Sequence, residues 1–381
     1  MSLNDQLQQA LAANSTVSKY FKDDQEISNL VRGVPLTGML PLQAVTRINS
    51  IPIGRFMTIA GDPNTGKSNL GWEICRIWRD YGGIIIYIGT EPKENVRTQK
   101  RLLHIRQSDP MTGVQYFKNV NTQDELKTIL NEINDLIIEN DPQGKVPVLI
   151  FIDSLAPLTS TKPRSEMTPK EKKKADETNN NMAAAHRAKN WKAILMDFQL
   201  NYVNERPLSI MGVNHFHKGV STNGMPAKSS DPGGRYIEYL NSWRLFLRRT
   251  DTNSVNSSNS SFGVEIKNTK QSSGSERDIK ITPRFKDWTV ELEEGEETKV
   301  CGFNWDEALI KLLLSDYTNN SKLKEIMDLK KEGQMVSSET LGCEKVSQSE
   351  MGKAIHENEE IYNKILDMFD VYECPLFPEP E

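Results

Sequence analysis

The chain has 381 residues and 37% hydrophobic content, enough for one large α/β domain with terminal additions or for two domains. No window approaches the ~18 apolar residues of a membrane span, and the polar N-terminus lacks a signal-peptide core, so we expect neither membrane insertion nor secretion. The formal charge of -5 excludes a globally basic surface for nucleic acid, so any such contact must come from local basic loops.

Cysteine usage and charge distribution indicate the cellular compartment and the part of the chain that carries the net charge. Four scattered cysteines form no C-x-x-C pair, which favours a reducing cytoplasm over a disulfide framework or a zinc site. Met351 to Glu381 holds eight carboxylates against Lys353 and Lys364, so residues 1–350 are close to neutral. This acidic segment is either plain solubilising surface or a competitor of DNA for basic loops.

The first 30 residues predict an arm. Leu7, Leu11, Val17 and Phe21 recur at the spacing of a short helix, followed by a polar break. Such a helix is marginal alone, so its apolar face docks either on the chain's own core or on a neighbouring subunit.

A phosphate loop follows. Gly61 to Ser68 reads G-D-P-N-T-G-K-S, between an apolar run at Phe56 to Ala60 and a helical pattern at Asn69 to Asp80. A glycine turn with an incidental lysine is the alternative, but the order of strand, loop and helix favours a nucleoside triphosphate site. Backbone N–H groups of such a loop face phosphates, while a lysine adds charge and a serine hydroxyl binds Mg²⁺. The predicted nucleotide-binding residues are Gly61, Asp62, Pro63, Asn64, Thr65, Gly66, Lys67, Ser68 and Asn69.

Further elements alternate along the chain. The remaining predicted strands are Ile84 to Ile88, Val148 to Ile152, Leu208 to Val213 and Trp243 to Leu247, and the remaining predicted helices are Glu94 to Ile105, Thr122 to Glu139 and about Ala175 to Leu200. This alternation predicts an α/β fold with a doubly wound, mainly parallel sheet, and a ligand at the carboxyl ends of the strands.

Three strands end in residues suited to nucleotide chemistry. Asp153 is expected to orient Mg²⁺ with Ser68, and Glu91 to act as general base, although a plain helix-start glutamate is the alternative for Glu91. His215 is expected to sense the γ-phosphate, the alternative being a surface histidine.

Two long polar segments, residues 159–181 and 216–235, exceed ordinary connections and carry lysines and arginines on flexible backbone. A third, Thr250 to Ser261, is a surface excursion between two strands. Helical patterns after residue 292 predict a small α-rich region over 293–381 with an acidic tail, and the core domain is placed at 31–292.

The order of these parts resembles the RecA-type strand-exchange recombinases, most closely the phage-encoded UvsX-like branch. The resemblance runs from about Asn4 to Leu292. Its motifs are I-P-I-G-R (51–55), the phosphate loop, Y-I-G-T-E (87–91), F-I-D-S (151–154), H-R-A-K (186–189), V-N-H (213–215), D-P-G-G (231–234) and W-R-L-F-L-R-R (243–249).

The resemblance implies a RecA-like ATPase core in which Lys67, Ser68 and Asp153 hold Mg-ATP and Glu91 activates water. His215 would couple the γ-phosphate to the second DNA loop, and Lys267 and Lys270 would reach the ATP of a neighbouring subunit, although K-N-T-K departs by one residue from the family's spacing. No aromatic side chain after Glu91 matches the family's adenine contact. The implied DNA-binding residues are Lys162, Arg164, Lys172, Lys173, Arg187, His217, Lys218, Lys228 and Arg235.

The function implied is a DNA-dependent ATPase that polymerises head to tail on single-stranded DNA and pairs it with double-stranded DNA. Single-strand-binding and mediator proteins are implied partners, and the host cytoplasm the implied location. Two alternatives stay open: a replicative hexameric helicase, which usually carries a larger N-terminal domain, and a nucleotide-switched filament or regulator without strand exchange.

Overall fold

The structure is a computed structural model, and it describes residues 32–91, 95–158, 168–170, 189–195, 207–215, 237, 240–251, 261–271, 279–293 and 295–378. The first half contains β1 (Gly33–Pro35), α3 (Leu40–Thr46), β2 (Ser50–Pro52), β3 (Phe56–Gly61), α4 (Lys67–Asp80), β4 (Ile84–Gly89), α5 (Val96–Leu102), β5 (Val114–Phe117), α6 (Gln123–Asn140), β6 (Val148–Asp153) and β7 (Leu208–His215). The second half contains β8 (Asn241–Arg249), β9 (Phe262–Gln271), β10 (Lys280–Ile281), β11 (Arg284–Glu293), β12 (Glu296–Phe303), α10 (Trp305–Leu313), α11 (Asn320–Ile326), β13 (Lys330–Glu332), β14 (Met335–Ser338), β15 (Cys343–Ser347), α12 (Gln348–Glu357) and α13 (Glu359–Met368).

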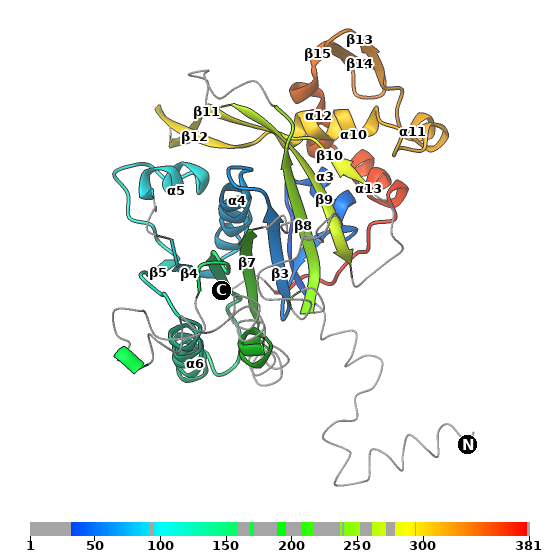
Figure 1. The fold of residues 1–381 in the computed structure, drawn as a ribbon. Coiled ribbons are helices and arrows are strands. Elements are labelled where there is room, and N and C mark those ends of the chain that lie inside the picture. Colours follow the sequence, from blue (N-terminus) through cyan, green and yellow to red (C-terminus); the bar gives the residue numbers. More distant parts are fainter. Residues whose placement is uncertain are drawn as a thin grey trace, which may run out of the picture.

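One large sheet organises the described part of the chain (Figure 1). It has ten strands in the order β12-β11-β9-β8-β3-β7-β6-β4-β5, with β10 paired to β9. The strands from β8 to β5 are parallel, whereas β9, β11 and β12 run antiparallel to their neighbours. The carboxyl ends of the parallel strands therefore meet along one edge of the sheet.

Both faces of the central parallel strands, β3, β4, β6 and β7, are buried. In β4, Ile85 and Tyr87 belong to the cluster that packs on α4, whereas Ile86 and Ile88 belong to the cluster that packs on α6. Near-continuous burial of this kind is what apolar runs predict for parallel strands covered by helices on both sides. The expected α/β fold with a doubly wound, mainly parallel sheet is confirmed.

The predicted elements with apolar runs are confirmed, with small shifts at their ends. Five predicted strands correspond to β3, β4, β6, β7 and β8, and the helices Asn69 to Asp80, Glu94 to Ile105 and Thr122 to Glu139 correspond to α4, α5 and α6. Of the helix predicted at about Ala175 to Leu200, residues 189–195 are described and helical. The segment 250–261 lies between two strands, as expected, and these are the antiparallel neighbours β8 and β9.

A strand was expected after residue 261 but without bounds, and the strands from β10 to β12 were not predicted. They have no long apolar run, and β9 carries its apolar residues at alternate positions, as Phe262, Val264 and Ile266. Strands that bury one face alternate in this way, and a search for continuous apolar runs overlooks them.

The C-terminal region contains more than helices. The expected helical patterns form α10 and α13, but β12 joins the large sheet and β13, β14 and β15 form a separate three-stranded sheet. Met351, Ile355 and Ile365 of α12 and α13 are fully buried in the main cluster. Phe377 N donates to the carbonyl of Gly33 at 2.9 Å, so the chain returns to β1 near its end.

Several predicted features lie outside the described residues. These are the N-terminal arm 1–30, nearly all of the segments 159–181 and 216–235, and the side chain of Lys270. The predicted DNA-binding residues outside the description are Lys162, Arg164, Lys172, Lys173, Arg187, His217, Lys218, Lys228 and Arg235. Among the helices that are described, none combines the length and the apolar character needed to cross a bilayer.

A buried carboxylate lies in the core between α4 and β12. Glu73 is 3% exposed, and its Oε1 accepts a hydrogen bond from Phe303 N at 2.5 Å while Oε2 accepts one from Trp305 Nε1 at 2.8 Å. Burial, the largest influence, raises the pKa of Glu73 to about 7, while Arg76 and the two hydrogen bonds act in the opposite direction.

This pKa shift predicts a pH dependence of stability. The folded state holds the Glu73 proton up to about pH 7, whereas the unfolded state releases it near its ordinary pKa of about 4.3. The free energy of unfolding should therefore fall as pH rises from about 5 to 8, by roughly 2 to 3 kcal/mol from this group. Urea unfolding of wild type and Glu73→Gln at pH 5 and pH 8 measures it. A difference between the two proteins that does not change with pH would contradict the assignment.

Candidate nucleotide site

Parallel pairing aligns the strand ends that carry the predicted site residues. Gly61 at the end of β3 pairs with His215 at the end of β7, and Gly89 of β4 pairs with Asp153 of β6. The structure thus brings the phosphate loop, Glu91, Asp153 and His215 to one edge of the sheet. The sequence patterns predicted this grouping.

The phosphate loop has a backbone that depends on glycine. Gly61 has φ of 152° and Gly66, the residue before α4, has φ of 83°. A Cβ at Gly61 would lie 2.3 Å from the carbonyl oxygen of Leu247 on β8. The loop therefore leaves β3 pressed against its neighbouring strand, and then turns so that α4 begins at Lys67.

The cation of the loop is partly withdrawn from water. Lys67 is 5% exposed and its Nζ donates a hydrogen bond to the carbonyl of Asp62 at 2.6 Å. Burial lowers the pKa of Lys67, while the carboxylates of Asp153 and Glu91 oppose that change. A cation held at the N-terminus of a helix, beside backbone N–H groups, suits a phosphate group.

The two expected Mg²⁺ ligands are in contact. Ser68 donates a hydrogen bond to the Asp153 carboxylate, and burial raises the pKa of Asp153 to about 6. Mg²⁺ in nucleotide sites typically keeps several waters and takes one or two protein oxygens with phosphate oxygens. A buried carboxylate beside a serine hydroxyl at the start of α4 fits that donor set.

Glu91 is held by side chains from two other strand ends. Its Oε1 accepts hydrogen bonds from Ser154 Oγ at 2.8 Å and from His215 Nε2 at 2.9 Å. The hydrogen bond from His215 is the largest influence that lowers the pKa of Glu91. A carboxylate kept ionised in this way can polarise a water, and it is linked directly to the residue that leads into segment 216–235.

One cleft of about 380 Å³ is lined by Lys67, Ser68, Glu91, Asp153 and His215, together with Asn64, Thr65, Gly66, Asn69, Arg249 and Phe262. Sequence reasoning gave no role to Arg249, although it ends β8 as His215 ends β7. Its guanidinium lies 5.0 Å from the centre of the Phe262 ring. The available signal was an arginine at the end of an apolar strand, but only the pairing of β8 with β3 shows that this strand end lies beside the phosphate loop.

The two lysines expected to act on a neighbour's nucleotide lie away from this cleft or outside the described atoms. Lys267 is on β9, with its Nζ 5.8 Å from the centre of the Phe246 ring, and it is not among the described residues that line the cleft. Lys270 lies near the end of β9. The structure therefore does not place these two lysines in the cleft of their own chain. It does not test whether they act at the nucleotide site of a neighbouring subunit.

Substitution of Gly61 tests the loop geometry. Gly61→Ala places a Cβ against the Leu247 carbonyl in a conformation that other residues rarely adopt, so it should lower the free energy of unfolding by about 2 kcal/mol or more. The control is Gly333→Ala, which has φ of 65° and nothing within 4 Å, and should cost about 1 kcal/mol. Equal costs by urea unfolding would contradict the close approach.

Comparison with known proteins adds a distant relationship. No family model matches the chain. The chain is 24% identical over 268 residues to "Protein RecA" of Helicobacter hepaticus, covering 68% of the chain and 66% of the relative. It is also 24% identical over 243 residues to "Protein RecA" of Ureaplasma parvum, covering 61% and 62%. The matches thus span slightly less than two thirds of the relatives' length. With the sheet described above, they show a RecA-like α/β core in a chain that is distantly similar to RecA.

Proposed function

We propose that this chain is an ATP-dependent recombinase of the UvsX-like branch, which forms a helical filament on single-stranded DNA and promotes pairing with a homologous duplex. The observation that carries the proposal is the convergence of Lys67, Asp153, Glu91 and His215 on one cleft at the carboxyl edge of the sheet. The distant relationship to RecA supports the same function.

In the proposed chemistry, the loop from Gly61 to Ser68 and the Lys67 ammonium hold the triphosphate, and Asp153 with Ser68 holds Mg²⁺, which neutralises charge on the phosphates. Glu91 orients the attacking water and accepts its proton. His215 is hydrogen-bonded to the Glu91 carboxylate. With ATP bound, an oxygen of the γ-phosphate would be a second hydrogen-bond partner for His215. Hydrolysis would therefore change the position of His215, and with it segment 216–235.

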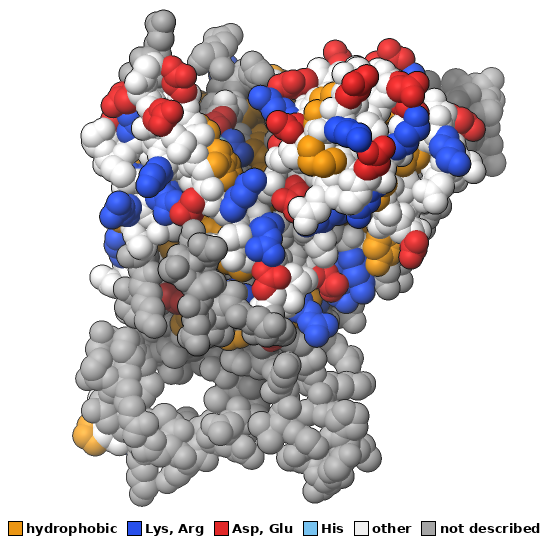
Figure 2. Space-filling view, turned by 90° about the horizontal axis from the view of Figure 1, so that it is seen from above, with side chains coloured by type: hydrophobic (Ala, Val, Ile, Leu, Met, Phe, Trp, Pro, Cys, Tyr) orange, Lys and Arg blue, Asp and Glu red, His pale blue; other side chains and the backbone are white. Residues whose placement is uncertain are grey.

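In the proposed filament, segments 159–181 and 216–235 contact DNA phosphates, and residues 1–30 pack on the next subunit. Lys267 and Lys270 complete the neighbour's ATP site. On the face in Figure 2, Lys and Arg side chains are interspersed with Asp and Glu, in keeping with DNA contact through local loops rather than through a broad basic surface. Single-strand-binding and mediator proteins, a phage origin and action in the host cytoplasm belong to the same proposal.

ATP hydrolysis with and without single-stranded DNA tests the function. We expect DNA to raise the rate at least about tenfold, and Lys67→Ala to abolish hydrolysis under both conditions because the charge on the phosphates is lost. Equal wild-type rates with and without DNA would contradict the recombinase while leaving an ATPase. Unwinding of a duplex without strand exchange would favour the helicase instead.

Glu91 can be tested separately from binding. Glu91→Gln keeps an acceptor for Ser154 and His215 but removes the base, so kcat should fall by about 10²-fold or more while the affinity for a non-hydrolysable ATP analogue stays within about threefold. The matched control is Glu297→Gln on the exposed β11–β12 hairpin, which should hydrolyse ATP at the wild-type rate. A Glu91→Gln protein with wild-type kcat would remove Glu91 from the mechanism.

A further inference from the structure

The buried carboxylate of Glu73 joins the nucleotide-binding helix to the junction between β12 and α10. Glu73 lies on α4, the helix that Lys67 begins, and its two oxygens accept from Phe303 N and Trp305 Nε1. Phe303 ends β12 and Trp305 begins α10. These two hydrogen bonds tie α4 to a part of the chain that lies some 230 residues away in the sequence.

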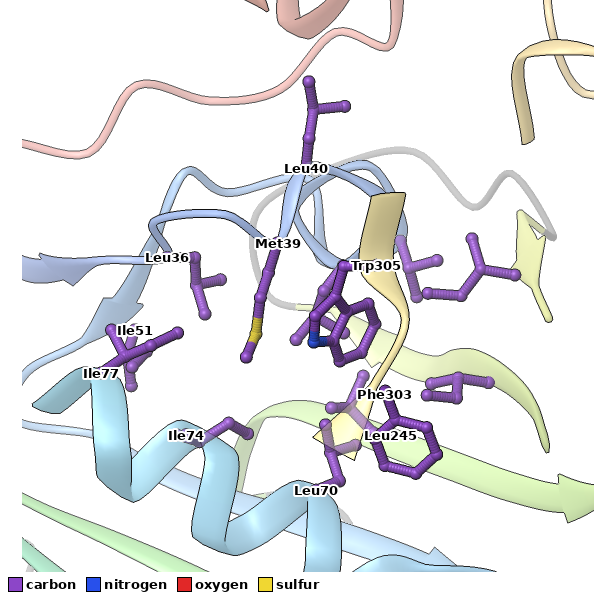
Figure 3. Packing of buried hydrophobic residues seen from close by; sticks show 14 of the residues in the cluster. Leu36, Met39, Leu40, Ile51, Leu70, Ile74, Ile77, Leu245, Phe303 and Trp305 are labelled. Carbon is purple, nitrogen blue, oxygen red and sulfur yellow. The ribbon is translucent and has the colours of Figure 1, made fainter. Parts of the chain in front are cut away.

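The same junction reaches the phosphate loop itself. A Cβ at Gly66 would lie 3.1 Å from Cζ of Phe303 and 3.3 Å from Cε2 of Phe262, so these rings rest against the backbone that begins α4. Figure 3 shows Phe303 and Trp305 in the same buried cluster as Leu70 and Ile74 of α4. One residue, Phe303, thus has its backbone fixed by Glu73 and its ring against the loop.

The other side of the junction is held by α12. Asn304 caps α10 and accepts a hydrogen bond from Ser349 Oγ at 3.2 Å, and Asp306 lies 2.6 Å from Nδ1 of His356. A Cβ at Gly352 would lie 2.2 Å from the carbonyl oxygen of Asp306, so α10 and α12 pack with their backbones close. The start of α10 is therefore rigidly attached to the C-terminal helices.

We infer that Glu73 is a positioning residue for the phosphate loop. It holds Phe303 against Gly66, and the packing of α10 and α12 thereby influences the geometry of the nucleotide site from outside the cleft. This inference rests on the proposed nucleotide-binding function and deepens it. Glu73 is not among the described residues that line the cleft, and its oxygens face β12 and α10. Substitutions at this junction change nucleotide affinity without removing any residue that lines the cleft.

Binding of a fluorescent non-hydrolysable ATP analogue and steady-state hydrolysis test the inference together. Glu73→Gln turns an amide N–H₂ toward the Trp305 N–H, and the two donors repel, so the Phe303–Trp305 junction moves away from α4 and Phe303 no longer rests firmly against Gly66. The Kd for the analogue and the KM for ATP should therefore both rise about tenfold. We expect kcat to change less than about twofold, since Glu91 and His215 lie on other strands. Trp305→Phe, a milder change, should raise Kd about threefold to tenfold.

The double variant Glu73→Gln with Trp305→Phe should bind no more weakly than Glu73→Gln alone, because both changes break the same bond. The exposed helix residue Glu132 provides the control: Glu132→Gln should bind as wild type does. Far-UV circular dichroism at the assay temperature confirms that each variant is folded.

Two negative results have different meanings. In the first, wild type binds the analogue and Lys67→Ala does not, while Glu73→Gln and Trp305→Phe bind as tightly as wild type. This result would overturn the positioning role alone. Wild type that fails to bind the analogue would overturn the proposed function and this inference with it. Additive losses in the double variant would also contradict the shared bond.

Discussion

The register of the parallel strands is the constraint on which the site depends. β3 is paired to β7 and β8 along its length, and its last residue, Gly61, aligns with His215 on one side and with Leu247 on the other. A slip of one residue would turn every side chain of a strand to the opposite face. Because both faces of these strands are buried by different helices, the hydrophobic clusters fix the register, and the register fixes which polar groups meet at the edge.

Two glycines also position the site, because they allow the phosphate loop and α4 to lie very close to neighbouring strands. Gly71 allows α4 to lie on β6, where a Cβ would come within 2.3 Å of the Phe151 ring, and Gly61 presses the loop against β8. Trp72, Tyr87 and Phe151 pack with ring centroids 4.8 to 5.5 Å apart beneath the start of α4. The start of α4, which carries Lys67 and Ser68, thus rests on a dense aromatic cluster contributed by α4, β4 and β6.

The sequence was most informative where local pattern and chemistry coincide. Apolar runs that end in Asp153, Glu91 or His215 predict both the strand and the polar edge. The contact of Ser154 with Glu91 and the position of Arg249 depend on which strands become neighbours, and strand order is not written in any local pattern. Glu73 was missed for the same reason: its partners lie some 230 residues away at a strand end whose alternating pattern gave a weak signal.

A structure of the protein with a non-hydrolysable ATP analogue and Mg²⁺ tests the central claim most directly. The account predicts phosphate oxygens within hydrogen-bonding distance of Lys67 Nζ, the metal beside Ser68 and Asp153, and Glu91 facing the γ-phosphate. A larger groove of about 750 Å³ lies at the amino end of β4, lined in part by Ile84, His104 and Arg106. Nucleotide bound in that groove, with the cleft at Lys67 empty, would contradict the account.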